Sequence, residues 1–210
     1  MQTQKINTIV LDMGQVLIHW KPGWVMENFH LNASQEALLQ RELFASVEWV
    51  RFDRGTITPA EMIASVNRRL PQELHPCVEN IVTGWWQRPL CPMEGMGELI
   101  RELKALGYGI YLLSNASLDL RKYFHRIPGS ECFDGLMVSA EEKLIKPQPE
   151  IYRALYARFS LDPQRSLFID DQPANIEAAM YTGMDGILFR GDTAALRREL
   201  NEKGIPVAQI

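Results

Sequence analysis

The sequence places an acid at the point where an apolar run ends. In NTIVLDMGQVL, Ile9, Val10 and Leu11 lead directly to Asp12, and Gly14 follows two residues later. The apolar run predicts a buried β-strand, so the carboxylate would stand at the carboxyl end of that strand. A carboxylate in such a place can attack an electrophile or bind a hard cation.

Other polar residues follow apolar runs of the same kind. Ser114 and Asn115 end GIYLLSN, Asp170 and Asp171 end SLFIDD, and Lys146 lies in the loop LIKPQPEIY. In open α/β sheets, ligands bind outside the carboxyl ends of the strands, so we expect these side chains to meet the first aspartate. The acids suit Mg²⁺, and the lysine and serine suit phosphate oxygens. Together they predict attack of the first aspartate on phosphorus beside a Mg²⁺ ion.

Short apolar runs alternate with helical patterns along most of the chain. The runs predict buried parallel strands at residues 8–13, 109–115, 135–140, 166–171 and 186–190. Helices are predicted at residues 93–107, 149–160, 173–183 and 192–204. The first of these helices has one apolar face, formed by Met96, Leu99, Ile100, Leu103 and Leu106, and Gly107 marks its end. The alternation predicts an α/β fold, a doubly wound parallel sheet with helices on both faces.

The interval of residues 18–90 lacks a predicted strand. Helical patterns fill it at residues 23–30, 34–52, 58–70 and 73–88. Thr58 is a predicted N-cap, with Pro59 at the first helical position. The sequence therefore predicts a Rossmann-like core, residues 1–17 and 91–210, with an α-helical cap of residues 18–90 inserted after the first strand.

The composition is that of an ordinary globular protein, with 210 residues, 46% hydrophobic residues and a net charge of −4. It has no block of Lys and Arg that would predict a nucleic-acid partner. Cys77, Cys91 and Cys132 lack metal-site spacing, which favours reduced thiols. Neither a signal-peptide pattern nor a transmembrane length of apolar residues is present. We expect a cytoplasmic protein, a monomer or homodimer, with no membrane or nucleic-acid partner.

Four stretches, in chain order LDMGQVL, LLSNAS, KPQPEIY and FIDDQPANIEAA, resemble the motifs of the haloacid dehalogenase-like superfamily of phosphohydrolases. The resemblance covers nearly the whole chain, and the helical interval resembles the small α-helical cap of that superfamily. It implies that Asp12 is the nucleophile, that Ser114 and Lys146 share in catalysis, and that Ser114, Asn115 and Lys146 bind phosphate.

The same resemblance implies a Mg²⁺ site and a substrate class. Asp12, the Gly14 carbonyl and Asp171 would hold the ion, and Asp170 would bind it directly or through water. The opening DMGQVLIHWKP is similar to the branch that includes bacterial sugar-1-phosphate phosphatases. The expected partner is therefore a small phosphorylated metabolite, such as a sugar phosphate.

Gly14 departs from the pattern of most phosphatases of that superfamily, which carry a second aspartate at this position. That aspartate protonates the leaving oxygen, and such general acid catalysis typically raises the rate by about 10²–10⁴-fold. Three explanations stay open. The substrate has a good leaving group, the cap supplies a substitute such as His19 or Asp53, or turnover has been lost.

The cap also contains the candidate residues for substrate specificity, namely His19, Arg51, Asp53 and Arg54. Loops carry binding residues disproportionately, and RFDRGTIT is a predicted loop. Besides a phosphatase, two functions remain open: a 2-haloacid dehalogenase, in which the aspartate attacks carbon without a metal, and a non-catalytic metabolite-binding regulator.

Overall fold

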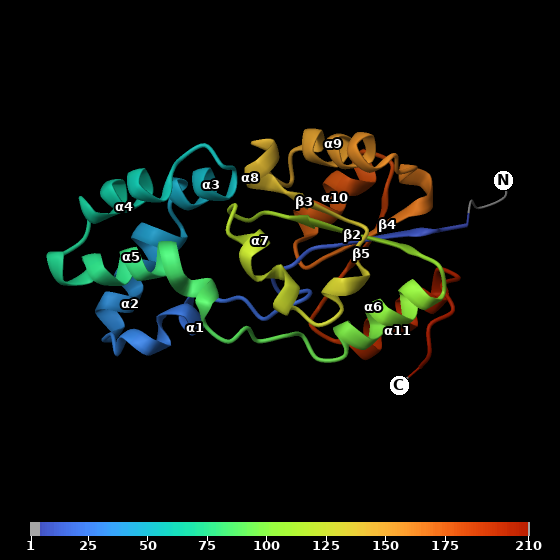
Figure 1. Ribbon diagram of the computed structural model, residues 1–210, viewed down its shortest axis with the longest axis horizontal. Helices are drawn as coiled ribbons and strands as arrows, with labels where there is room; N and C mark the ends of the chain where they lie inside the picture. The colour runs from blue at the N-terminus through green and yellow to red at the C-terminus, as the bar shows by residue number, and fades with distance from the viewer. Residues whose placement is uncertain (1–4, 210) are drawn as a thin grey trace.

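Five short strands form one parallel sheet in the computed structural model, which describes residues 5–209 (Figure 1). The strands are β1 (Thr8–Leu11), β2 (Gly109–Ser114), β3 (Gly135–Val138), β4 (Ser166–Asp170) and β5 (Asp185–Leu188). Their order across the sheet is β3-β2-β1-β4-β5, and every neighbouring pair is parallel. The predicted α/β fold with a doubly wound parallel sheet is confirmed. The predicted strands extend one or two residues too far at their carboxyl ends, because the chain leaves the sheet there, after β3 directly into the helical turn of residues 139–142.

The register of the central strand places the strand ends side by side. Leu11 of β1 lies opposite Leu112 of β2 and Ile169 of β4. The next backbone N–H, that of Asp12, donates to the Ile169 carbonyl oxygen at 2.9 Å. Asp12 therefore leaves the sheet beside Asp170, the last residue of β4.

Helices cover both faces of the sheet because each strand is apolar on both sides. They are α6 (Met96–Ala105), α9 (Pro149–Phe159), α10 (Pro173–Tyr181) and α11 (Thr193–Glu202). Ile9 and Leu11 pack in one hydrophobic cluster with α6 and α11, whereas Val10 packs in a second cluster with α9 and α10. Figure 1 shows these two pairs of helices on opposite sides of the sheet. One predicted core residue, Leu106, is instead 45% exposed, because α6 ends at Ala105.

Helices alone occupy the chain between Pro22 and Gln87, and we call residues 22–87 the helical insertion. It contains α1 (Pro22–Met26), α2 (Ala33–Leu39), α3 (Val47–Asp53), α4 (Pro59–Asn67) and α5 (His75–Gly84). These helices gather at one end of the molecule, beyond the carboxyl ends of the strands (Figure 1). The exact cap limits, residues 18–90, stay a prediction.

Local sequence accounts for where the inserted helices begin. Thr58 caps α4 as predicted, with a reciprocal capping box to Glu61 and with Pro59 in the first turn. The predicted single helix of residues 34–52 is wrong, because a π-helical turn (Gln40–Phe44) interrupts it. Ser46 then starts α3 by accepting a hydrogen bond from the Trp49 N–H.

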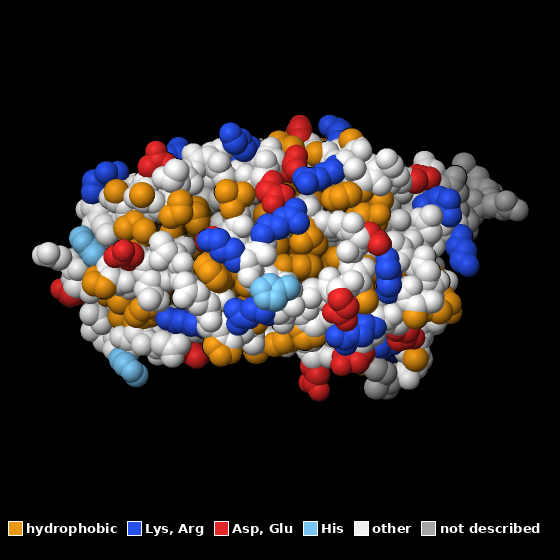
Figure 2. Space-filling view, viewed as in Figure 1, with side chains coloured by type: hydrophobic (Ala, Val, Ile, Leu, Met, Phe, Trp, Pro, Cys, Tyr) orange, Lys and Arg blue, Asp and Glu red, His pale blue; other side chains and the backbone are white. Residues whose placement is uncertain are grey.

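Shorter elements complete the chain. The α-helical turns are α7 (Leu120–Tyr123) and α8 (Ser139–Glu142). The 3₁₀ turns are Glu27–Phe29, Gln72–Leu74, Trp85–Gln87, Phe124–Arg126, Ser130–Cys132 and Pro163–Arg165. Across residues 5–209, no helix combines the length and the apolar character needed to cross a bilayer. On the face in Figure 2, Lys and Arg side chains are interspersed with Asp and Glu.

The loop after α3 joins the helical insertion to the sheet domain by close packing. Gly55 has φ +71°, and a Cβ built on it would lie 2.2 Å from the carbonyl oxygen of Ala140 in α8. The buried Ser139 hydroxyl donates to the carbonyl oxygen of Asp53 and accepts from the backbone N–H of Ala116 at 2.9 Å. Only glycine allows this approach, so the loop of residues 53–55 has a fixed position against α8.

Replacing Gly55 should therefore cost more stability than replacing an equally strained glycine in open space. Gly107 is the matched control, because its φ is +87° and nothing lies within 4 Å of its built Cβ. Gly55→Ala and Gly107→Ala should each lose about 1–2 kcal/mol from the left-handed backbone. The collision with Ala140 should add about 1–3 kcal/mol to the Gly55 loss. Urea denaturation measures both values, and equal losses would contradict the close packing.

Candidate active site

A buried lysine lies between two buried aspartates at the carboxyl edge of the sheet. The Lys146 ammonium nitrogen is 2.8 Å from Asp12 Oδ1 and 2.7 Å from Asp170 Oδ2. The side chains of Lys146 and Asp170 are 1% and 0% exposed, and that of Asp12 is 11% exposed. The structure thus brings together three of the predicted site residues, which come from different segments of the sequence.

Asn115 fixes the backbone of that lysine. The Asn115 amide oxygen accepts a hydrogen bond from the Lys146 N–H at 2.8 Å, and its amide nitrogen donates to the Lys146 carbonyl at 3.0 Å. The Lys146 ammonium also lies 5.3 Å from the ring centre of Phe168, a residue of β4. Both amide atoms of Asn115 are therefore bound to Lys146, an arrangement that the prediction of a phosphate contact did not include.

The two adjacent aspartates have different environments. Asp170 accepts hydrogen bonds from the Gln172 N–H at 2.8 Å and from the Asn175 amide at 3.0 Å, in addition to Lys146. Asp171 is half-buried, and the Gln172 side chain donates to it at 2.6 Å. Among the side-chain hydrogen bonds of residues 5–209, Asp171 thus accepts fewer than Asp170 does, which leaves oxygen lone pairs on Asp171 for another partner.

Carboxylate oxygens of Asp12, Asp170 and Asp171 all lie within 4.8 Å of one another. Like charges so close repel, and the single ammonium of Lys146 leaves the group with a net negative charge. Hard divalent cations such as Mg²⁺ prefer such oxygen ligands. The donor set therefore fits a divalent cation.

The pKa values reflect this crowding. Burial raises the pKa of Asp12 to about 6, against the opposing effect of Lys146, and the Asp170 charge raises it further. Burial also raises the pKa of Asp171, with a smaller contribution from Asp170. For Lys146, burial acts to lower the pKa, but the two carboxylates outweigh burial and raise it, so the lysine stays charged.

A cavity of about 110 Å³ opens beside Asp12 and lies between the carboxyl ends of the strands and the helical insertion. Its polar lining includes Asp12, Gly14, Ser114, Asn115, Ser117 and Asp53. Its aromatic lining consists of Trp20, Trp49, Phe52, Trp85 and Tyr123. The rings contact one another, with centroids 5.6 Å apart for Trp20 and Trp49 and 5.1 Å apart for Trp85 and Tyr123.

These aromatic residues are the part of the site that the sequence did not indicate. From the sequence, Trp49 and Trp85 are best interpreted as packing residues of the inserted helices, because a tryptophan in a helical pattern most often packs in the core. Trp20 lies just after the first motif, whereas Tyr123 has no motif around it. Phe52, Trp85 and Tyr123 belong to the hydrophobic core, Trp20 and Trp49 pack against it, and all five also line the cavity.

The four predicted specificity residues lie in different places. Asp53 lines the cavity with Asp12. His19 is exposed and borders a separate depression with Asp171, and Arg51 lines an outer groove with Arg68. Arg54 is half-buried, and its Nε has no hydrogen-bond partner within residues 5–209.

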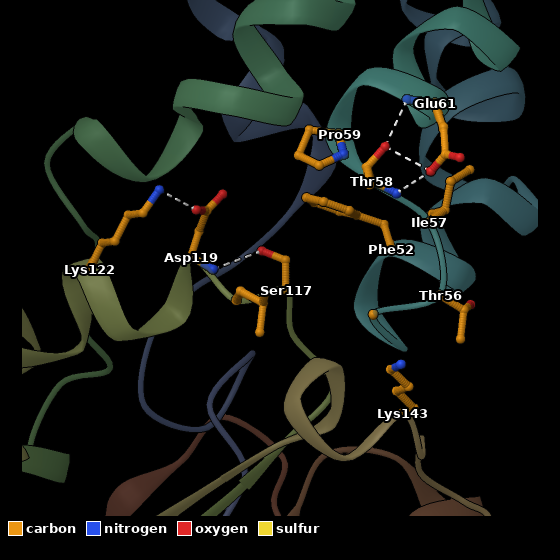
Figure 3. Close-up of a pocket in the computed structure, with 12 residues that line it drawn as sticks. Phe52, Thr56, Ile57, Thr58, Pro59, Glu61, Ser117, Asp119, Lys122 and Lys143 are labelled. Carbon is orange, nitrogen blue, oxygen red and sulfur yellow. Dashed lines mark hydrogen bonds and ion pairs between the residues drawn. The ribbon is translucent and has the colours of Figure 1, made fainter.

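A larger cleft of about 730 Å³ adjoins the cavity and shares Phe52 and Ser117 with it (Figure 3). Residues 55–59 of the helical insertion form one side, and Asp119, Lys122 and Lys143 form the other. Lys122 pairs with Asp119 at 2.7 Å, so this pair is neutral. The cleft provides room for the part of a ligand that the small cavity cannot hold.

Comparison with known proteins identifies the family. A family model described as haloacid dehalogenase-like hydrolase matches residues 6–183. This chain belongs to the haloacid dehalogenase-like hydrolases. The sesquiterpene phosphatase astK of Aspergillus oryzae is 28% identical over 200 residues, which is 92% of this chain and 94% of that protein.

Two further proteins are similar to this chain. Flavin mononucleotide hydrolase 1 of Arabidopsis thaliana is 25% identical over 76% of this chain and 63% of that protein. A family enzyme of Bacteroides thetaiotaomicron, solved as a magnesium complex, has a TM-score of 0.70 and 23% identity. That likeness covers 93% of this chain and 100% of the other, and it shows the shared fold.

Removing the central lysine should destabilise this hydrolase strongly. Lys146→Met leaves two buried carboxylates without their cation, and breaking a buried pair in this way typically costs about 3–5 kcal/mol. Lys122→Met is the control, because Lys122 is 58% exposed and its pair with Asp119 should contribute less than about 1 kcal/mol. Urea denaturation in the presence of a chelator measures both losses. A loss for Lys146→Met no larger than that of the control would contradict the central role of this ion pair.

Proposed function

We propose that this hydrolase is a Mg²⁺-dependent phosphatase that cleaves a small phosphorylated metabolite through an aspartyl-phosphate. The observation that carries the proposal is the convergence of two further carboxylates, Asp170 and Asp171, and one buried lysine on Asp12. That charge pattern suits a cation and a phosphate together. The phosphatase and hydrolase names of the relatives agree with it.

The metal ligands proposed are those that the family resemblance implies. Asp12, the Gly14 carbonyl and Asp171 would hold Mg²⁺, and within residues 5–209 Asp171 accepts one side-chain hydrogen bond, from Gln172. Asp170 is occupied by Lys146, Gln172 and Asn175, so we assign it to holding the lysine and to contact with the metal directly or through water. Bound Mg²⁺ supplies positive charge beside the transferring phosphoryl group.

The protein side chains perform the transfer itself. An Asp12 carboxylate oxygen forms a bond to phosphorus while the bond from phosphorus to the leaving oxygen breaks. Lys146 and the Ser114 hydroxyl hold the non-bridging oxygens, and Asn115 keeps Lys146 in place. Water then attacks the aspartyl-phosphate, which releases phosphate and restores Asp12.

The helical insertion would select the substrate. We propose that the cap, residues 18–90, has this role, and that the Trp20, Trp49 and Trp85 rings form the main walls of the substrate cavity. Aromatic rings pack well against the apolar face of a sugar or of another compact carbon skeleton. Arg51, Arg54 and His19 lie outside the cavity lining, so any effect of theirs on selectivity would concern a substrate that extends beyond it.

A 2-haloacid dehalogenase is the second candidate, because it too would use Asp12 as a nucleophile. It needs no cation, whereas the cluster of three acids in this chain favours one. A metabolite-binding regulator without turnover is the third. Cytoplasmic location and a monomer or homodimer stay predictions.

The Asp12→Asn variant tests the nucleophile. Its turnover of 4-nitrophenyl phosphate with Mg²⁺ should fall by more than about a thousandfold, because the amide cannot form the covalent intermediate. Circular dichroism checks the fold. Near-normal turnover in a folded Asp12→Asn protein would contradict the assignment, and release of chloride from 2-chloropropionate by the wild type would favour the dehalogenase instead.

Mg²⁺ should stabilise the native protein by mass action. At a hundred times its dissociation constant, a ligand of the native state adds about 2.7 kcal/mol to the free energy of unfolding. Asp171→Asn should reduce the rise in melting temperature caused by Mg²⁺, and Glu177→Gln, at a nearby exposed acid of α10, should not. A rise of equal size in both variants would contradict the role of Asp171 as a ligand, and activity that persists after chelation would contradict the metal requirement.

A further inference from the structure

Gly14 leaves the proposed phosphatase without an acid beside its nucleophile, yet cleavage of an alkyl phosphate needs one. The oxygen that leaves an alkyl ester is strongly basic and needs a proton as its bond to phosphorus breaks. Among the cavity-lining residues, the carboxyl groups belong to Asp12 and Asp53. Asp12 makes the bond to phosphorus, so Asp53 is the carboxyl group left to carry a proton.

Asp53 lines the cavity from the helical insertion, whereas the nucleophile lines it from the sheet. Asp12 comes from the end of β1, whereas Asp53 is the last residue of α3 in the helical insertion. In an in-line displacement, the leaving oxygen lies on the side of phosphorus opposite the nucleophile. A proton donor from the helical insertion would therefore face the leaving oxygen.

The backbone at Asp53 is held in place by the core. Its carbonyl accepts a hydrogen bond from the buried Ser139 hydroxyl, and Gly55, two residues later, packs directly on Ala140. Ser139 also accepts a hydrogen bond from the N–H of Ala116, the residue after Asn115. The position of Asp53 is thus linked to the same segment that holds Lys146.

We propose that Asp53 is the general acid and base of this enzyme, in place of the carboxyl group that is absent at Gly14. The assignment rests on the proposed phosphatase function. In the first half, the Asp53 O–H gives its proton to the leaving oxygen as the bond between that oxygen and phosphorus breaks. In the second half, the Asp53 carboxylate takes a proton from water as the water oxygen bonds to phosphorus and the bond to Asp12 breaks. Asp53 ends protonated, as it began.

The surroundings of Asp53 keep its proton at neutral pH. Burial raises the pKa of Asp53 to about 8, and a hydrogen bond from Trp49 opposes this only in part. The titratable groups that line the cavity with it are Asp12 and Tyr123, while Asp119 in the adjoining cleft is paired with Lys122. An ordinary aspartate would have lost its proton well below pH 7.

Two other donors fit less well. Tyr123 donates its hydroxyl hydrogen to Met13 Sδ at 3.4 Å, and burial raises its pKa far above the ordinary value, so it releases a proton poorly. His19 is exposed and borders the depression beside Asp171, outside the cavity lining.

The experiment compares two esters of similar size that differ in leaving group. Benzyl phosphate releases a basic alkoxide, whereas 4-nitrophenyl phosphate releases a stable phenolate that needs little protonation. Asp53→Asn should lower kcat for benzyl phosphate by about 10²–10⁴-fold and kcat for 4-nitrophenyl phosphate by less than about tenfold. In the wild type, benzyl phosphate turnover should fall above pH 8 more steeply than 4-nitrophenyl phosphate turnover. A loss of equal size for both esters, or none for benzyl phosphate, would overturn the assignment.

A second variant separates lost chemistry from lost structure. A Cβ built on Gly14 has nothing within 4 Å, and Gly14 lies outside the left-handed region, so a residue with a side chain can stand there without backbone strain. Gly14→Asp in the Asp53→Asn background should restore benzyl phosphate turnover at least tenfold. Asp53→Asn should melt at or above the wild-type temperature at pH 8, because it removes a carboxyl group whose ionisation burial disfavours.

The outcomes for this assignment and for the proposed function are distinct. A wild type that cleaves neither ester, with or without Mg²⁺, would overturn the phosphatase function itself. A wild type that cleaves both esters in an Asp12-dependent way, but whose Asp53→Asn variant loses the same factor in kcat for both or none for benzyl phosphate, would overturn the Asp53 assignment alone.

Discussion

The ion pairs of Lys146 with Asp12 and Asp170 are the interaction on which the site depends. Two aspartates this close inside a protein could not both stay ionised without a neutralising charge, because burial and mutual repulsion oppose their ionisation. The lysine comes from the loop after β3, and Asn115 after β2 binds its backbone on both sides. Segments that follow β1, β2, β3 and β4 are thereby tied together at one edge of the sheet.

The sheet and the helical insertion make different contributions to the cavity. The sheet supplies charge, because Asp12 lines the cavity and Lys146 and Asp171 lie next to Asp12, and that charge suits a phosphate group. The insertion supplies three of the aromatic walls, Trp49, Phe52 and Trp85, and one carboxyl group, that of Asp53. With charge and walls supplied by different parts of the chain, the walls can differ in shape without a change in the charged residues, and the walls decide which ester fits.

Holding the insertion against the core has structural costs. Gly55 adopts a left-handed backbone so that the loop can lie against Ala140, and burial raises the pKa of Asp53 to about 8. Both features work against folding stability, yet they place a protonated carboxyl group in the cavity. Strain and buried polar groups commonly collect at functional sites, where position matters more than stability.

The sequence by itself determined the fold class, the strand-end positions of the polar residues and the cap of α4, because these depend on local patterns of apolar residues and on Thr58 with Pro59. It also identified the family through four local motifs. Only the tertiary structure decided which distant residues meet. His19 is near Asp12 in sequence but lies outside the cavity lining, whereas Asp53 is far along the chain and lines it. The reason is physical: strand order and the packing of the insertion on α8 are long-range contacts, and no local pattern encodes them.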